Sequence, residues 1–296
     1  MTGTIISASL NADIPARYAR WFMGRVEAGY CTLPRRDGLQ HRRVDLAPHA
    51  VAGFVFWTRR LEPFMGELDE LRRRGYGFTI QFALTGYPRD IDPSPLAVEA
   101  ALDELHLAAQ RFGPRAVVWR YDPIVITPTL TTEWHVENFH HLARGVCGAT
   151  DEVILAFASS GCRRGGGHAD SAVGVPHRRR FLVATLAPIA RGSGLRLCVC
   201  SDVEALAPGA APARCIDADR LADSTGHCDA VPTGGIRPGC LCARAVDIGD
   251  RVGSSPHLFC GALSRRRTWP QRGPADEMLY PQRTRFAQPS DDELPF

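Results

Sequence analysis

AVVWRYDP, residues 116–123, is an apolar and aromatic run that is interrupted by Arg120 and Asp122. Near-continuous apolar runs of this length are typical of strands that are buried on both faces of a parallel sheet. Similar runs are TIISAS (4–9), VAGFVFWT (51–58), FTIQFALT (78–85), EVILAFAS (152–159) and LRLCVCSD (195–202). Together these runs predict a parallel sheet of six strands.

Helix signals lie between the runs. Asp13 and Pro15 form a capping aspartate and a first-turn proline, and Thr131 can cap a helix that continues through Trp134. After Ser94-Pro95, residues 96–112 have apolar positions spaced close to the helical period. Repeated strand–helix units form right-handed crossovers and, when six or more accumulate, barrels. The expected fold class is α/β, with a partial or full TIM-like (β/α) barrel of parallel strands.

The regular pattern stops after residue 205 and divides the chain into three parts. We expect a (β/α) barrel domain at 1–205 and an irregular, cysteine-rich segment packed on the barrel at 206–262. The last part, 263–296, is polar and rich in proline, which is typical of a surface-following or disordered tail.

The composition excludes several classes of function. With 35 basic and 32 acidic residues, the net charge of +3 is too small to indicate a nucleic-acid or membrane partner. All basic residues are arginine, which excludes a Schiff-base lysine and a P-loop lysine. The chain has no run of 18 apolar residues, and its start lacks the pattern of a signal peptide. We therefore expect a soluble, cytoplasmic protein; its oligomeric state is not indicated.

Polar residues at the expected strand ends are the candidate ligand-binding residues, because parallel α/β sheets bind ligands at the carboxyl ends of their strands. The period of two places Arg120 and Asp122 on the same face of their strand. The planar guanidinium of Arg120 suits a carboxylate or a phosphate. A purely structural ion pair between these two residues is the alternative. The expected contacts of a small-molecule ligand are Trp57, Gln81, Thr85, Arg120 and Asp122.

Cysteines crowd into the last third of the chain. Cys240-Leu-Cys242 forms a close pair, with Cys228 before it and Cys260 after it. Four thiolates of this kind can hold zinc or an iron–sulfur cluster, although zinc ribbons prefer pairs with two intervening residues. Cys198 and Cys200 lie in an expected strand, where cysteines are more often small buried hydrophobic residues.

Segments spread over residues 4–249 resemble an uncharacterised bacterial family, domain of unknown function family 1848. They are IISAS, DIPARYARWFMGRVEAGYC, FVFWT, QFALTGYPRDIDP, VVWRYDPIVIT, EWHVENF, CIDADRL and CLCARAVDIGD. The resemblance implies a radical-SAM-like barrel whose iron–sulfur cysteines follow the C-x-C and DIG segments as a C-x3-C-x2-C motif. Three thiolates would bind a [4Fe–4S] cluster, and its fourth iron would be open to S-adenosylmethionine.

The sequence departs from that motif, because its three positions are Ser255, Phe259 and Ala262. Three hypotheses follow. The chain is a radical-SAM-like enzyme with substitute ligands, or a degenerate barrel that is a binding protein or a pseudo-enzyme, or a protein with a structural zinc site. The substitute ligands for iron or zinc are Cys228, Cys240, Cys242 and Cys260. The sequence leaves the choice between enzyme and non-enzyme open.

Overall fold

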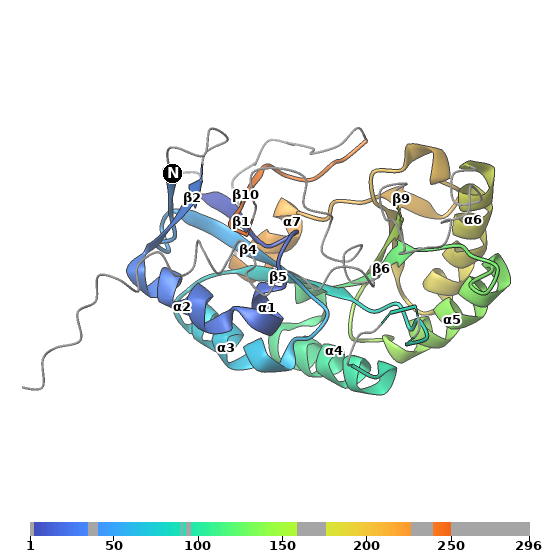
Figure 1. The fold of residues 1–296 in the computed structure, drawn as a ribbon, viewed down its shortest axis with the longest axis horizontal. Helices are drawn as coiled ribbons and strands as arrows, with labels where there is room; N and C mark the ends of the chain where they lie inside the picture. Colours follow the sequence, from blue (N-terminus) through green and yellow to red (C-terminus); the bar gives the residue numbers. More distant parts are fainter. Residues whose placement is uncertain are drawn as a thin grey trace, which may run out of the picture.

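The computed structural model describes residues 3–34, 41–89, 91–92, 96–158, 176–225 and 239–249. They form an α/β fold around a parallel sheet with the strand order β10-β1-β4-β5-β6-β7-β8-β9 (Figure 1). The six predicted runs form the six central strands, and short β9 and β10 form the edges. The strands are β1 (Thr4–Ala8), β4 (Val51–Thr58), β5 (Phe78–Ala83), β6 (Val117–Ile124), β7 (Glu152–Phe157), β8 (Arg196–Val199), β9 (Ala210–Pro212) and β10 (Ala245–Asp247).

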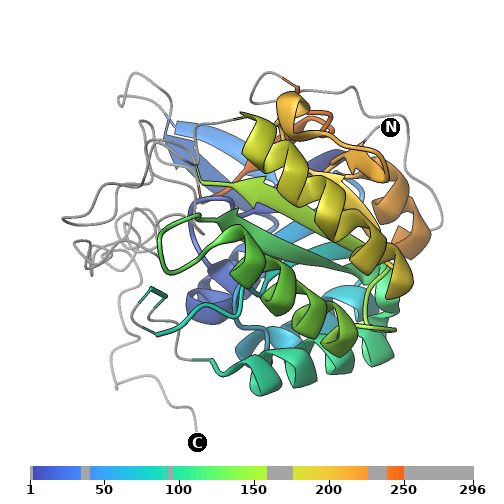
Figure 2. The same cartoon turned by 90° about the vertical axis from the view of Figure 1, so that its right-hand side faces the viewer.

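Apart from α7, the long helices lie on one face of this sheet, which we call the outer face (Figures 1 and 2). Asp13 caps the first helix by accepting a hydrogen bond from Ala16 N, and Thr131 caps α5 through Trp134 N, both as predicted. No helix among the described residues is long and apolar enough to span a membrane. The helices are α1 (Ile14–Arg17), α2 (Ala19–Ala28), α3 (Met65–Arg73), α4 (Val98–Phe112), α5 (Thr132–Gly145), α6 (Pro176–Gly192) and α7 (Ala218–Thr225).

The larger of the hydrophobic cores lies between these helices and the outer face. Phe22 of α2 meets Phe54 and Phe56 of β4 edge-on, with ring centroids 5.2 and 5.4 Å apart. On the next strands, Trp119 of β6 stacks on Phe139 of α5 at 5.0 Å. Because alternate residues of each strand point to opposite faces, this packing directs Arg120 and Asp122 to the other face.

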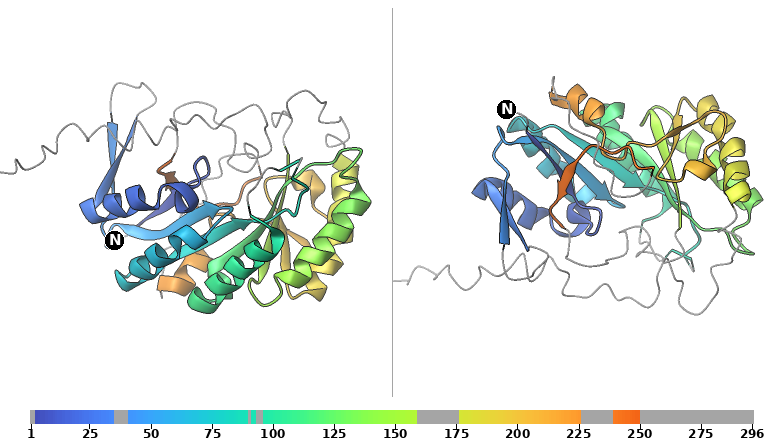
Figure 3. Two further views of the ribbon diagram at one scale, coloured as in Figure 1. Left: turned by 60° about the horizontal axis from the view of Figure 1, so that its bottom comes forward. Right: turned by 90° about the horizontal axis from the view of Figure 1, so that it is seen from above.

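The last strand of the sheet returns to the first, since β10 pairs with β1. A full barrel, which the sequence prediction allowed, is not shown, because no ladder in the described part of the chain joins β9 to β10. One backbone hydrogen bond, from Ala243 N to Ile216 O at 2.9 Å, links the segments near these two edges. Figure 3 shows the chain after β9 crossing from that side of the sheet toward α7 and β10.

Opposite the helices, the inner face of the sheet carries a second, smaller core. Residues 213–221 and 240–243 pack on it, and α7 lies against β4 and β5. Leu221 of α7 is fully buried, and a Cβ atom on Gly53 would lie 2.7 Å from its Cδ2. The inner core consists mainly of Ile5, Val55, Trp57, Ala83, Val118, Ile154, Cys198, Ala213, Cys215, Ile216, Leu221, Cys242 and Ala243.

The structure contains one strand pair that was not predicted, and one predicted segment lies outside the described residues. The antiparallel pair β2 (Tyr30–Pro34) and β3 (His41–Asp45) was not predicted, because neither segment is an apolar run. The expected tail at 263–296 lies outside the described residues, as does most of the interval 226–262.

Candidate functional site

Arg120 and Asp122 lie side by side on the inner face, near the carboxyl end of β6. The Asp122 carboxylate oxygen Oδ2 accepts hydrogen bonds from Arg120 Nη2 at 2.6 Å and from Nε at 3.1 Å. Arg120 is 1% exposed and Asp122 4% exposed. The two side chains share a face of β6 as their spacing predicted, and they form the ion pair of the structural alternative, almost completely removed from solvent.

Two neighbouring strands add side chains to this pair. Gln81 Oε1 accepts a hydrogen bond from Arg120 Nη1 at 3.2 Å, and the Trp57 ring centroid lies 5.0 Å from the guanidinium carbon. Trp57 and Gln81 are register partners on β4 and β5, which explains why they reach the same guanidinium. The structure therefore brings together four of the predicted ligand contacts: Trp57, Gln81, Arg120 and Asp122.

Thr85 lies just after β5 and is buried. Its backbone carbonyl accepts a hydrogen bond from Asn138 Nδ2 of α5 at 2.8 Å. That contact fixes the loop after β5 from the helix side, so the structure gives Thr85 a contact with the helix layer. Its role in binding a ligand stays a prediction.

Sequence reasoning missed an acidic residue that extends the same polar group across the sheet. Asp247 at the end of β10 accepts hydrogen bonds from Ser7 Oγ at 2.7 Å and from the backbone nitrogen of Leu10 at 2.8 Å. Trp57 Nε1 donates to the same Ser7 oxygen at 3.1 Å. Burial raises the pKa of Asp247, and these hydrogen bonds partly offset that effect. Asp247 is the first residue of the DIG segment, but no apolar run marked β10 as a strand.

Three cysteine side chains gather beside Arg120 on the inner face. Cys215 Sγ lies 3.5 Å from Cys200 Sγ, and the thiols of Cys215 and Cys242 are also hydrogen-bonded. The hydrogen bond shared with Cys215, together with burial, raises the pKa of Cys200 far above its ordinary value. The raised pKa values of Cys200 and Cys215 favour the protonated thiol, which is a poor nucleophile.

Two of the four metal ligands expected from the sequence, Cys240 and Cys242, lie among the described residues. Cys242 is buried with Cys200 and Cys215 in the inner core, and the partly buried Cys240 packs against the same core. Among the described residues, no group of three His, Cys, Asp or Glu side chains could hold a metal ion. Cys228 and Cys260 lie outside the described residues, as do Ser255, Phe259 and Ala262.

The helix side of β6 is held by a separate polar network. His135 of α5 is fully buried, with Nδ1 2.7 Å from the Tyr121 hydroxyl and Nε2 3.0 Å from the Val125 carbonyl. Burial lowers the pKa of His135 to about 4, so its ring is neutral at physiological pH. A neutral ring donates from Nε2 to the carbonyl and accepts at Nδ1 from the hydroxyl. Asn138 Nδ2 also donates to the Tyr121 hydroxyl, at 3.0 Å.

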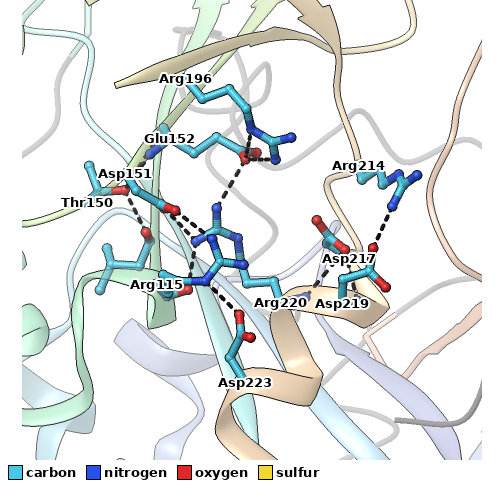
Figure 4. Close-up of polar contacts among 11 residues, drawn as sticks. Arg115, Thr150, Asp151, Glu152, Arg196, Arg214, Asp217, Asp219, Arg220 and Asp223 are labelled. Atoms are coloured by element: carbon cyan, nitrogen blue, oxygen red, sulfur yellow. Dashed lines mark hydrogen bonds and ion pairs between the residues drawn. The ribbon is translucent and has the colours of Figure 1, made fainter. Parts of the chain in front are cut away.

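A second buried arginine lies at the opposite, amino-terminal end of the sheet (Figure 4). Arg220 of α7 donates to Asp151 Oδ1 at 2.8 Å, to Glu152 Oε2 at 3.1 Å and to the Arg115 carbonyl at 2.7 Å. Arg196 of β8 shares the Glu152 carboxylate. In barrels the amino-terminal face serves stability and the carboxyl-terminal face binds ligands. The predicted ligand contacts around Arg120 lie at the carboxyl-terminal end of the sheet, and Arg220 lies at the amino-terminal end.

One comparison with known proteins gives the family of this chain, and none of them gives a function. A family model described as Domain of unknown function (DUF1848) matches residues 5–260. No curated protein matches the chain. Among solved structures, a putative alpha-L-fucosidase from Bacteroides thetaiotaomicron VPI-5482 is 10% identical, with 88% of this chain and 91% of that chain covered and a TM-score of 0.28. A likeness this weak carries no argument about fold or function.

Proposed function

This chain belongs to the DUF1848 family, and from that premise we propose that it binds a small organic molecule with a carboxylate or phosphate group. The binding site is the inner face of the sheet at the carboxyl ends of its strands. Arg120 is the anchor for the anionic group, and Trp57, Gln81 and Asp122 hold the guanidinium in place.

One observation carries this proposal: the buried ion pair joins two residues of a single strand. Removing two charges from water costs several kcal/mol per ion, and the attraction between them seldom returns more than that. Arg120 and Asp122 are two positions apart on β6, so the ion pair itself joins no second strand. Arg120 reaches β5 and β4 through the uncharged side chains of Gln81 and Trp57. The desolvation of this ion pair costs free energy, while the pair adds little to the positioning of other strands. This imbalance supports a role in ligand binding.

The chemistry of the pair suits an anion. Nε and Nη2 of Arg120 are directed at Asp122, and Nη1 is directed at Gln81. A planar guanidinium presents five donors, and hydrogen bonds to a charged partner are roughly twice as strong as neutral ones. Asp122 keeps the fork in one orientation, which lowers the entropy lost when a carboxylate or phosphate binds.

A binding screen with two substitutions tests the proposal. The probes are inorganic phosphate, acetate, malonate and citrate, and binding is followed by calorimetry on the full chain. We expect at least one probe to bind, and Arg120→Ala to weaken its affinity by about tenfold or more, which corresponds to about 1.4 kcal/mol. Arg60→Ala, at an exposed arginine that pairs with Glu62, serves as the control and leaves the affinity unchanged. Equal affinities in a folded Arg120→Ala protein would overturn the proposal.

The family resemblance carries a second proposal, that of an iron–sulfur cluster with S-adenosylmethionine, or of a structural zinc ion. Its ligands would be Cys228, Cys240, Cys242 and Cys260, and Cys242 would have to leave its contact with Cys215. Iron, acid-labile sulfide and zinc on anaerobically purified protein test it, with Cys240→Ala/Cys242→Ala alongside. About four irons per chain that the variant lacks support the cluster, and about one zinc supports the structural site.

A further inference from the structure

A cavity of about 610 Å³ lies between the first turns of α5 and α6, on the rim formed by the loop after β6. The two helices lie side by side on the outer face (Figure 2). Its volume is in the range of sites for small molecules, which is about 300–1,000 Å³. The cavity is separate from the group around Arg120, which faces the inner side of the same sheet.

One wall of the cavity is basic. His177 and Arg178 of α6 line it and are exposed, and Thr132 of α5 lines it opposite them. In the described part of the chain Arg178 forms no ion pair, whereas the next residue, Arg179, pairs with Asp202 at 2.8 Å. The guanidinium of Arg178 is therefore available to an anion.

The acidic residue that lines the cavity, Glu133 of α5, is already hydrogen-bonded. The carboxylate of Glu133 is hydrogen-bonded to its own backbone nitrogen and to the Thr131 hydroxyl, and these contacts lower its pKa. It satisfies the amino terminus of α5, and carboxylates are favoured at that end of a helix. Its charge is thus directed to the helix backbone, while Arg178 remains for a ligand.

Part of the lining is apolar. Phe181, about one helical turn after His177 and Arg178 on α6, lines the cavity and is 65% exposed, and Ile126 and Pro128 of the loop after β6 line it as well. An exposed aromatic ring beside basic side chains can stack on a flat apolar group of a ligand whose charge the basic side chains bind.

We propose that this cavity binds a small aromatic phosphate, with the ring on Phe181 and the phosphate on Arg178 and His177. The apolar and the basic residues each contact a different part of such a ligand. Neither an uncharged ring nor a free phosphate therefore makes both sets of contacts. The proposal concerns a second site and does not depend on binding at Arg120.

Phenyl phosphate is the probe, with phenol and inorganic phosphate as its two fragments. We expect phenyl phosphate to bind the full chain in calorimetry, and each fragment to bind about tenfold more weakly or worse. Arg178→Glu removes the binding, whereas the matched Arg180→Glu, at an exposed arginine of the same helix that does not line the cavity, changes the affinity less than about twofold. Phe181→Ser weakens phenyl phosphate but not inorganic phosphate.

Three outcomes would overturn the proposal. The first is no saturable binding of phenyl phosphate at millimolar concentration. The second is an equal loss in Arg178→Glu and Arg180→Glu, because that result indicates general charge attraction. The third is loss of phenyl phosphate in Arg120→Ala but not in Arg178→Glu, which places the probe on the inner face. Circular dichroism confirms that each variant is folded.

Discussion

The two ends of the sheet each bury an arginine against carboxylates, but the contacts of the two arginines differ in what they connect. Arg120 bonds mainly to Asp122, two residues away on the same strand. Arg220 lies on α7 and bonds to Asp151, Glu152 and the Arg115 carbonyl, which are 69, 68 and 105 residues away in sequence. The amino-terminal arginine thus joins a late helix to β6 and β7, and the carboxyl-terminal one joins β6 mainly to itself.

This difference separates the two roles that a buried ion pair can have. A network between distant segments specifies where α7 packs. The desolvation cost of its charges is therefore offset by a defined position of that helix. The Arg120–Asp122 pair lies within one strand and does not position a distant segment in this way, and this difference supports the ligand-binding role that we propose for it. If this distinction is correct, substitutions at the two ends affect different measurements: stability at the amino end and binding at the carboxyl end.

Arg220→Met tests the amino end and has the largest expected effect. The substitution leaves Glu152, which is 1% exposed, with one cation instead of two, and it removes a partner from Asp151. We expect a loss of about 3–5 kcal/mol in the free energy of unfolding, the typical cost of breaking a buried pair. Urea unfolding followed by circular dichroism measures it.

Arg214→Met provides the control for that measurement. Arg214 forms an ion pair with Asp219 at 2.8 Å, but its side chain is 52% exposed and that of Asp219 is 80% exposed. Exposed pairs contribute about 0–1 kcal/mol, so this variant should unfold at nearly the wild-type urea concentration. Equal losses in both variants would contradict a special role of the network in holding α7.

Lowering the pH tests the carboxyl end of the sheet. There the neutral side chains of His135, Tyr121 and Asn138 form hydrogen bonds on the outer side of β6. His135 has a pKa of about 4 in the folded chain against 6.5 in the unfolded chain, because burial disfavours its charged form. Its stabilising contribution is complete above pH 6.5 and is lost as the pH falls toward 4, because the unfolded chain binds the proton first. The loss amounts to about 3 kcal/mol. The difference in unfolding free energy between wild type and His135→Gln, measured from pH 7 to 4, should narrow by this amount; parallel curves would contradict it.

Gly53→Ala tests whether α7 depends on packing as well as on charge. The new Cβ atom would lie 2.7 Å from Leu221 Cδ2 and 3.3 Å from the Gly77 carbonyl oxygen. Overpacking of this kind costs about 1–3 kcal/mol, and Leu221→Ala in the same chain should make the second substitution less costly than it is alone. Gly66→Ala on α3, where no atom lies within 4 Å, is the matched control and should be neutral or slightly stabilising.

The carboxyl-terminal group was largely predictable from sequence, and the amino-terminal network was not. Gln81, Arg120 and Asp122 interrupt apolar runs, so their strand and face follow from the period of two. Arg220 lies on a short helix after the regular pattern stops, and its partners are fixed only by the path of residues 213–221 across the inner face. Long-range packing of this kind leaves no local signal.

The cysteines also depend on contacts that spacing does not reveal. Cys240 and Cys242 are two positions apart, and both pack on the inner core, where Cys242 contacts Cys215; their role as metal ligands stays a prediction. The edge strands were missed for a related reason. β9 and β10 have only three residues each, and pairing with β8 and β1 makes them strands rather than their own composition.

Arg120→Met/Asp122→Leu has the smallest expected effect on stability and breaks the comparison most directly. Replacing both members of a buried pair by apolar residues of similar size is often neutral or stabilising, because no charge is left without its partner. Gln81 loses one hydrogen bond, so we expect a change within about 1 kcal/mol in urea unfolding, together with complete loss of the anion that binds wild type. The corresponding double variant at the other end, Arg220→Met/Glu152→Leu, should still be strongly destabilised, because Asp151 and Arg196 each lose a partner. Equal destabilisation at both ends would mean that the Arg120 pair also holds the fold, and the argument for ligand binding from its burial would then fail.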